Sequence, residues 1–517
     1  MPHWNEMSWN QPGRKASLSR SPMFGVILLL GLLAMTARPA TDPDLWWHLR
    51  TGEWIVETGH VPHLDPFSFT RAGQPWVAHE WLSELIFYEL WKHGGAAALT
   101  ILSAIVTTAG FMFLYFRCPG KRHWAAAATV LGALASAPSW GVRPQMFTFT
   151  LASLLLWLID RGEKRPALLF WIPPLFLLWL NLHAGFALAL ALLVAYGIGL
   201  ILETALGDLP WHEARPIVLR ILLLLLACFA LVPLNPSGMQ LYRYPLDTLR
   251  SSGMRSLIAE WFSPDFHQWL YRPLLLIWLI VIVALATSRS RPKGRWLIPL
   301  VLTALAALDA VRHIPIFVLV AMPVITAALR RDANSLHAPE RVSLTTPFSR
   351  WFRPAFNGAI IALIATFALA KWVSLTRTQD TRVAAAFPAQ AVSFLKSGND
   401  SGRLFVYYDW AGYSIWELYP AYRVFVDGRA DLYGDSLLND STATMINIRT
   451  GWREILDRWK VDSALLPPDC ALAQALSLEP GWRVEYRDSR AIILIRRSPE
   501  VKSAVISLKT IAVTLRK

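Results

Sequence analysis

The chain is poor in charged residues. Asp, Glu, Lys and Arg make up 17% of its 517 residues, whereas a soluble domain typically carries about a quarter. Hydrophobic residues account for 54% of the chain. So little charge combined with so much apolar side chain excludes a cytosolic globular enzyme.

Cysteine is also scarce, and the familiar catalytic motifs are missing. The three cysteines, Cys118, Cys228 and Cys470, lie far apart and have neither the spacing of metal ligands nor that of a redox pair. The sequence contains no glycine-rich phosphate loop, nucleophile elbow or zinc motif. It therefore indicates neither a disulfide framework nor a zinc site.

Several long apolar stretches lack charge altogether, among them Ala96–Phe116 and Ala184–Leu202. About 20 helical residues of this kind cross the ~30 Å hydrocarbon layer of a membrane. The 25 tryptophans fit, because indole rings gather at membrane–water interfaces. We predict an α-helical polytopic membrane protein with about eleven transmembrane helices, at Met23–Ala37, Ala96–Phe116, Trp124–Val142, Pro144–Ile159, Pro166–Leu182, Ala184–Leu202, Ile221–Leu241, Pro273–Thr287, Trp296–Leu308, Ile314–Leu329 and Pro354–Ala370.

The formal charge of +14 comes from cations that lie in short loops between the apolar stretches, on one side of the predicted membrane. This distribution orients a protein in a bilayer and argues against nucleic acid as a partner. The basic loops are expected in the cytoplasm, so the leader 1–22 is cytoplasmic and an odd number of spans exports the C-terminal part. Residues Ala37–Ala40 leave open a cleaved signal peptide as the alternative to the first span.

The chain divides into a membrane domain, 23–372, and an exported α/β domain, 373–500, followed by a basic tail, 501–517. The membrane domain has two exported loops, 41–95 with amphipathic helices and 235–272. In the α/β domain, short β-branched or aromatic runs predict strands at Arg403–Tyr408, Tyr422–Asp427, Ser463–Leu466, Trp482–Tyr486 and Ala491–Ile495. Helices are predicted at Ala411–Leu418, Thr442–Lys460 and Ala471–Leu476.

Almost no ionisable residue lies inside the predicted spans. Ion-coupled pumps and transporters place charges near the bilayer centre, so this absence argues against transport. Polar residues instead gather at span ends on the outer face, where we expect any chemistry: Asp42, Asp44, His48, Glu53, His79, Glu80, Glu84, Arg143, Asn181, His183, Asn235, Tyr242, Glu260, His267, Asp309, Arg312 and His313.

The segment Asp42-Pro43-Asp44 directly follows the first span. Desolvation at the hydrocarbon boundary raises the pKa of a carboxyl group, so one of these acids could accept the proton of an attacking hydroxyl. The alternative is a helix cap, because Asp is favoured at the N-cap and Pro at the first helical position.

An acid after the first span, a long first exported loop, roughly eleven spans and an exported C-terminal domain together resemble the GT-C superfamily of integral-membrane glycosyltransferases. That superfamily includes the protein O-mannosyltransferases, the aminoarabinose lipid A transferase and the oligosaccharyltransferase catalytic subunit. The segments that look like an uncharacterised bacterial group of the superfamily are Asp42–Leu49, Asp65–Phe69, His79–Glu84, Arg312–Phe317 and Asp427–Tyr433. The chain departs from the mannosyltransferase pattern, since it has Asp-Pro-Asp where those enzymes have Asp-Glu.

The resemblance implies transfer of a sugar from a polyprenyl-phosphate donor to an acceptor on the outer face of a bacterial plasma membrane. Asp44, with Asp42 second, would take the proton of the acceptor hydroxyl, which attacks the anomeric carbon and inverts it. Arg143, or Arg312 with His313, would hold the leaving phosphate. Further candidate substrate-binding residues are His48, His79, Glu80, His183, Glu260 and Trp261.

Each of these further candidates has a structural alternative. His79 and Glu80 could form the polar face of an interfacial helix, and His183 could be a polar turn residue. Arg312 and His313 could anchor a span, and Trp261 could anchor its loop. Asp427–Asp431 follows a predicted strand and could bind an acceptor, or it could be a charged turn that Gly428 closes.

The partners expected are membrane lipid, a polyprenyl-phosphate-linked sugar and an acceptor of unknown kind. No cofactor is certain, and a divalent metal, Mg²⁺ or Mn²⁺, is a candidate. The alternative function is a non-catalytic membrane protein that binds or presents lipid-linked glycan in envelope assembly. A transporter is the third possibility.

Overall fold

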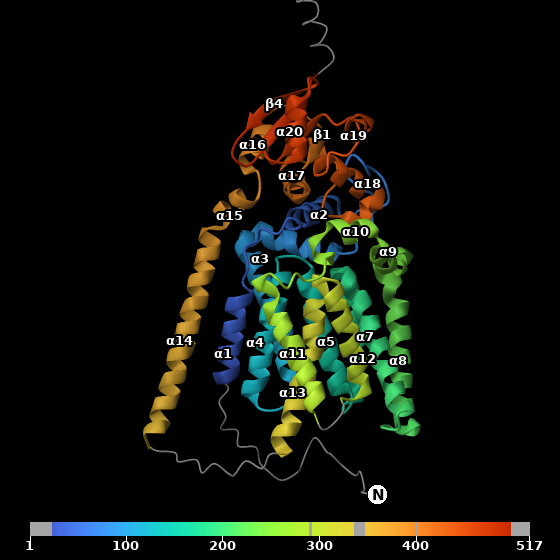
Figure 1. The fold of residues 1–517 in the computed structure, drawn as a ribbon, viewed down its shortest axis with the longest axis vertical. Coiled ribbons are helices and arrows are strands. Elements are labelled where there is room, and N and C mark those ends of the chain that lie inside the picture. Colours follow the sequence, from blue (N-terminus) through green and yellow to red (C-terminus); the bar gives the residue numbers. More distant parts are fainter. Residues whose placement is uncertain (1–22, 289–291, 336–346, 399–400, 498–517) are drawn as a thin grey trace, which may run out of the picture.

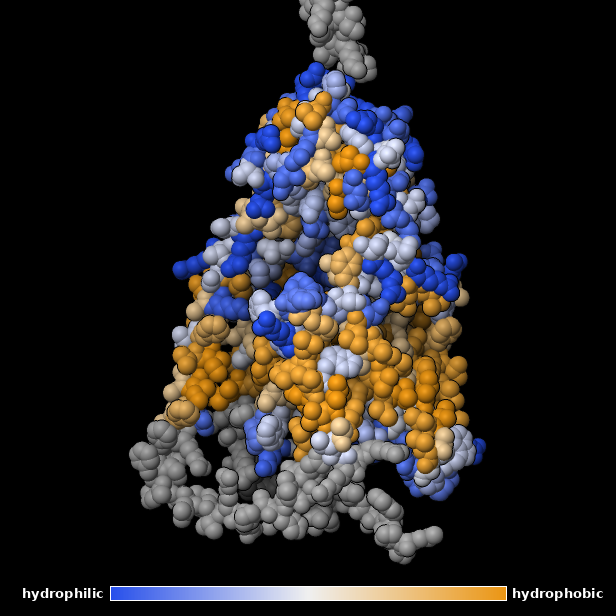
Figure 2. All heavy atoms as spheres, viewed as in Figure 1, coloured by the Kyte–Doolittle hydropathy of each residue, from blue (hydrophilic) through white to orange (hydrophobic). Residues whose placement is uncertain are grey.

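The computed structural model describes residues 23–288, 292–335, 347–398 and 401–497. The leader 1–22 and the tail 501–517 lie outside these ranges. The chain forms a layer of long helices, and a smaller unit built on a β-sheet sits at one end of them (Figure 1). On the face shown in Figure 2, apolar side chains form a broad band over the helical layer, whereas polar side chains dominate the surface of the sheet unit.

A helix lies at each of the eleven predicted spans. By length and composition alone, six helices in the described ranges are apolar enough to cross a membrane, so the chain is a helical membrane protein. The number of crossings stays a prediction. The helices at the eleven predicted spans are α1 (Met23–Thr36), α3 (Trp81–Arg117), α4 (Arg122–Ser136), α5 (Gln145–Gly162), α6 (Ile172–Leu182), α7 (Ala187–Ala205), α8 (Trp211–Leu231), α11 (Arg272–Thr287), α12 (Gly294–Asp309), α13 (Ile314–Ser335) and α14 (Pro347–Arg377).

The first long loop contains helix α2 (Leu45–Thr58) and the amphipathic start of α3. Gly95 interrupts α3 with a left-handed φ of 58°, a conformation that glycine adopts without steric cost. The break falls one residue before the predicted span begins at Ala96. It separates the polar first part of the helix from the apolar part that enters the helical layer.

The sheet contains a strand at each of the five predicted positions: β1 (Gly402–Val406), β2 (Tyr422–Val424), β3 (Ser463–Leu466), β4 (Trp482–Arg487) and β5 (Ile492–Arg496). Its order is β2-β1-β3-β5-β4. Strand β1 runs parallel to β2 and to β3, whereas β5 is antiparallel to β3 and to β4. Helices α15 (Gln379–Ala386) and α16 (Ala389–Ser397) connect α14 to this sheet.

The helices between the strands are α17 (Ala411–Leu418), α18 (Ala430–Met445), α19 (Trp452–Arg458) and α20 (Ala471–Leu478). The single helix predicted at Thr442–Lys460 is wrong. The chain leaves the helix after Met445, and both Ile448 and Gly451 have positive φ angles, of 44° and 94°. Left-handed residues cannot continue a right-handed helix, so two helices replace the one predicted.

A buried ion cluster fastens the first loop to the sheet unit. The guanidinium of Arg429 lies 2.8 Å from a carboxylate oxygen of Asp65 and 2.7 Å from one of Asp427. The hydroxyl of Tyr433 donates to Asp427 at 2.5 Å. All three charged side chains are almost fully buried. Asp65 lies more than 300 positions before Asp427 and Arg429 in the sequence, so the cluster joins two distant parts of the chain.

The same loop also pairs with the edge of the sheet. The amide of Phe69 donates to the carbonyl of Val424 at 3.1 Å, and the amide of Val424 donates to the carbonyl of Phe67 at 3.3 Å. These bonds extend strand β2 with a short stretch of the first loop. They join the first loop to the sheet unit through backbone contacts.

Candidate active site

A cavity of about 490 Å³ lies where α2, the start of α3, the loop between α8 and α11, and the sheet unit meet. It brings together nine of the eleven predicted site residues, although they come from distant parts of the chain. They are Asp44, His48, His79, Glu80, Arg143, His183, Glu260, Trp261 and Arg312. Asp42 contacts this group from beside the cavity, and His313 lies in a neighbouring groove.

Asp44 occupies the N-cap position of α2, but its side chain makes no capping hydrogen bond. Its carboxylate turns to the cavity and accepts a hydrogen bond from the indole of Trp47 at 3.2 Å. Asp42 instead accepts from the amide of Asp44 at 3.1 Å. The two acids therefore have different tasks: Asp42 holds the backbone of the turn, and Asp44 presents a carboxylate to the cavity.

The surroundings of Asp44 suit proton transfer near neutral pH. Burial, followed by repulsion from Asp42, raises the pKa of Asp44 to about 7, although Arg143 and Trp47 oppose the shift. The side chain is 32% exposed, so a molecule in the cavity can reach it. A carboxyl group with a pKa near the working pH is a good general base.

Arg143, two residues before α5, is surrounded by acids. It forms an ion pair with Glu260 and lies 3.4 Å from Asp42 and 3.6 Å from Asp44. Gln145 donates to the second oxygen of Glu260 at 3.0 Å. Because three carboxylates already surround Arg143, its guanidinium is less suited to bind a phosphate than to orient these acids.

Glu80 lies at the centre of three histidines. Its carboxylate oxygens are 2.9 Å from His79, 3.5 Å from His183 and 3.6 Å from His48. Burial alone would raise the pKa of Glu80, but the histidines lower it below the ordinary value. Burial would likewise lower the pKa of His79, but Glu80 raises it, so these two form an ion pair. Burial lowers the pKa of His48 to about 3, which leaves that ring neutral.

His183 has a defined tautomer. The indole of Trp179 donates to the hydroxyl of Thr148 at 2.8 Å, and that hydroxyl lies 2.7 Å from Nδ1 of His183. The amide of Gly185 donates to the same nitrogen at 2.9 Å. Because Nδ1 accepts, the proton of the neutral ring sits on Nε2, which points to Glu80 and the cavity.

A second, apolar groove of about 370 Å³ adjoins the polar cavity and runs between α5, α7 and α13. The two share a junction lined by Arg143, His183, Tyr244, Trp261 and Arg312. The guanidinium of Arg312 lies 4.4 Å from the ring centre of Trp261. Among the described residues, Arg312 has no carboxylate partner within ion-pair distance, so its charge is available to a ligand at this junction.

His313 lies in the apolar groove, and its Nδ1 is 3.1 Å from the carbonyl oxygen of Ala306. Arg312 and His313 were predicted to hold one phosphate together. Only Arg312 lies at the polar junction, and His313 does not line the polar cavity.

The cavity also contains residues that the sequence analysis did not select. Gln145, Tyr244, Tyr408 and Asp409 line it. Asp431, at the start of α18, also lines it and belongs to the candidate segment Asp427–Asp431. Tyr408 and Asp409 lie two and three residues after the end of strand β1, in a region from which side chains often reach a ligand. That signal was present in the sequence, but nothing there placed the end of β1 opposite Asp44.

No group of three or more His, Cys, Asp or Glu side chains in the described part of the chain is arranged to hold a metal ion. The acids nearest Asp44 surround Arg143 instead. The candidate Mg²⁺ or Mn²⁺ stays a prediction, and no step below passes through a metal.

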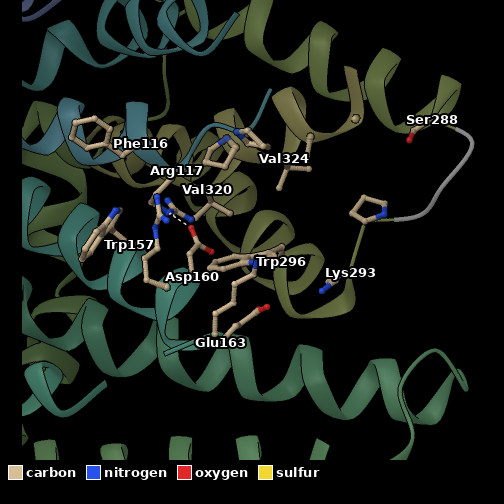
Figure 3. Close-up of a pocket in the computed structure, with 17 residues that line it drawn as sticks. Phe116, Arg117, Trp157, Asp160, Glu163, Ser288, Lys293, Trp296, Val320 and Val324 are labelled. Carbon is tan, nitrogen blue, oxygen red and sulfur yellow. Dashed lines mark hydrogen bonds and ion pairs between the residues drawn. The ribbon is translucent and has the colours of Figure 1, made fainter. Parts of the chain in front are cut away.

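A further pocket, of about 370 Å³, opens at the opposite end of the helical layer. Arg117 and Asp160 form an ion pair of 2.7 Å at its centre, beside Trp157 and Trp296 (Figure 3). It contains no predicted site residue. The predicted site residues therefore gather in the cavity beneath the sheet and not in this pocket.

Comparison with known proteins gives relatives by structure only; no protein-family model and no curated protein sequence matches the chain. The archaeal oligosaccharyltransferase AglB of Archaeoglobus fulgidus, in complex with an inhibitory peptide and a dolichol-phosphate, superposes with a TM-score of 0.52 at 12% identity over 86% of this chain and 69% of that one. The apo form of the Archaeoglobus fulgidus oligosaccharyltransferase gives 0.51 at 13% identity over 87% and 70%.

ArnT of Cupriavidus metallidurans, bound to undecaprenyl phosphate, gives 0.49 at 14% identity over 92% of this chain and 98% of that one. At 12% and 13% identity, the two oligosaccharyltransferase matches are evidence for the fold alone. Together with the helical layer, the first loop and the sheet unit, they show that the chain has the fold of the GT-C membrane glycosyltransferases.

Proposed function

We propose that the protein transfers a sugar from a polyprenyl-phosphate donor to an acceptor hydroxyl. The observation that carries the proposal is the junction of two unlike cavities, a polar one with Asp44 and an apolar one. Between them lies Arg312, which has no carboxylate partner in the part of the chain that the structure describes. A lipid-linked sugar has the matching parts, namely an apolar chain, a phosphate and a polar sugar.

The residues can divide the reaction as follows. Asp44 takes the proton of the acceptor hydroxyl, and the freed oxygen forms a bond to the anomeric carbon. The bond between that carbon and the phosphate oxygen breaks, and its electron pair leaves with the polyprenyl phosphate. Arg312 lies at the junction, where it stabilises the negative charge on the leaving phosphate.

The likeness to AglB supports the choice of lipid, because that enzyme is bound to a dolichol-phosphate in its structure. The distribution of basic loops supports a plasma membrane with the cavity on the outer face and the N-terminus in the cytoplasm. Labelling of single-cysteine variants in intact cells with a non-permeant maleimide tests this sidedness, and labelling near Asp44 only after lysis would contradict it.

The donor site is tested with Arg312→Gln. We expect this change to lower sugar transfer about 100-fold or more and to weaken the binding of undecaprenyl phosphate in nanodiscs, because a charge-assisted contact to the phosphate is lost. Transfer is measured as release of polyprenyl phosphate from lipid-linked sugars, with and without a chelator of divalent metals.

The matched control is Arg255→Gln. Arg255 pairs with Asp309 at 2.8 Å on the same rim but lines neither cavity. Equal effects of the two substitutions would overturn the assignment of Arg312. Donor binding by the wild type without any release of lipid phosphate would instead support the non-catalytic alternative.

Gly428 tests whether the carboxylate of Asp44 must stay where it is. A Cβ atom at Gly428 would lie 1.9 Å from a carboxylate oxygen of Asp44, so Gly428→Ala must displace one of them. We expect transfer to fall about 100-fold, since a misplacement near 1 Å has that effect on a catalytic group. Gly481→Ala is the control, because a Cβ atom there meets nothing within 4 Å. Unchanged transfer by Gly428→Ala would contradict the role given to Asp44.

A further inference from the structure

The sheet unit has a crevice of its own, beside the cavity described above. It measures about 540 Å³ and lies at the carboxyl ends of β1 and β3. Tyr407, Asp409 and Trp410 follow β1, and Pro467, Asp469 and Cys470 follow β3. Arg490, Phe387 and the segment around Pro43 complete the lining.

The position of the crevice follows from the topology of the sheet. The chain leaves β1 toward β2 on one side and later returns to β3 on the other side of β1, with all three strands parallel. The connections therefore diverge at the carboxyl ends of β1 and β3. In open α/β sheets, ligands bind in the crevice that this divergence leaves.

The side chains in the crevice have the chemistry of a carbohydrate site. Asp409 and Asp469 are exposed, and neither carboxylate has an ion pair or hydrogen bond with another described residue. They can accept hydrogen bonds from sugar hydroxyls. Tyr407 is half-buried against Trp410, with ring centres 5.2 Å apart, and it offers an apolar face beside those acids.

The crevice continues into the reaction cavity. Pro43 and Asp409 line both, and Pro43 directly precedes Asp44. Helix α17 packs tightly against the segment at Pro43, because a Cβ atom at Gly412 would lie 2.5 Å from the carbonyl oxygen of Pro43. A molecule with one hydroxyl at Asp44 and a longer body would pass Asp409 and enter the crevice.

We propose that this crevice binds the body of an oligosaccharide acceptor while its terminal sugar presents a hydroxyl to Asp44. The inference rests on the proposed transferase function and adds the class of acceptor. Two carboxylates against the single cation Arg490 favour a neutral glycan over one that carries phosphate groups, since like charges repel. The acceptor expected is therefore a neutral chain of sugars rather than a single small molecule.

The full-length protein in nanodiscs is tested on an array of short neutral and phosphorylated oligosaccharides. We expect wild type to bind neutral members, and the double variant Asp409→Asn/Asp469→Asn to bind them about tenfold more weakly, because carboxylates are the stronger acceptors. Glu417→Gln is the matched control and is expected to keep this binding, because Glu417 pairs with Lys396 at 2.8 Å and lines neither the crevice nor the cavity. Thermal unfolding checks that each variant is folded.

Three results would overturn the proposal: no neutral oligosaccharide bound by wild type, equal binding by the double variant, or a preference for phosphorylated members. Failure of the transferase function gives a different result. In that case wild type binds the neutral oligosaccharide, and the double variant loses it, but no lipid phosphate is released from any donor.

Discussion

Replacing Asp44 by Asn is expected to lower sugar transfer by about 10²–10⁴-fold, the contribution of a positioned general base. The amide keeps the size of the side chain and can still accept the hydrogen bond from Trp47, but it cannot take a proton at neutral pH. The protein should remain folded, because the Asp44 side chain makes no capping hydrogen bond to α2. Release of polyprenyl phosphate measures transfer, and binding of undecaprenyl phosphate shows that the donor site is intact.

Asp42→Asn is the matched control. An amide oxygen at this position can still accept from the amide of residue 44, so the turn should persist. We expect a much smaller loss of transfer than with Asp44→Asn. A larger loss would exchange the roles of the two acids, and wild-type transfer by Asp44→Asn would remove the general base from the proposal.

The pH dependence of transfer gives an independent test of the same group. Asp44 acts in its deprotonated form, and its pKa is raised to about 7. Transfer should therefore rise with pH through about 7 and fall about tenfold per unit below it. Because repulsion by Asp42 contributes to the raised pKa, Asp42→Asn should move the profile to lower pH. A profile that is flat around neutral pH would contradict the assignment.

The second large effect concerns stability. Arg429→Met is expected to destabilise the protein by about 3–5 kcal/mol, because it leaves the carboxylates of Asp65 and Asp427 buried without their cation. Thermal unfolding in detergent, followed by tryptophan fluorescence, measures the loss. Increased proteolysis of the first loop should accompany it, since the cluster joins that loop to the sheet unit.

Arg453→Met is the comparison. Arg453 pairs with Glu479 in the same unit, but its side chain is 60% exposed, and an exposed ion pair contributes only about 0–1 kcal/mol. Equal stability of the two variants would show that the buried cluster does not hold the loop.

Much of the helical layer can be predicted from the sequence because its signal is local. An apolar stretch without charge, such as Ala184–Leu202, is unfavourable in contact with water, and its length matches the thickness of the hydrocarbon layer. Gly95 likewise coincides with a predicted boundary. The helix predicted at Thr442–Lys460 was wrong because its apolar pattern continues through residues whose backbone turns left-handed. Backbone conformation of this kind depends on the surrounding fold.

The candidate site was partly predictable for a related reason. His79, Glu80 and Arg143 share one physical signature, a polar side chain at the end of an apolar stretch, and the structure places them together. The environment of Asp44 depends on Gly428, which comes from a distant segment. The different availability of Arg143 and Arg312 could not be predicted either, since it follows from three acids that fold around the first and not the second.

The pairing of the first loop with strand β2 has a consequence for where the sheet unit ends. A fragment cut at residue 373 would lack Phe67–Phe69 and would expose the unpaired backbone of Val424 at the sheet edge. Exposed edges of this kind recruit strands from other molecules, so the excised fragment would self-associate. The boundary of the unit along the sequence and its boundary in space are therefore different, and a soluble version would need the first loop grafted onto it.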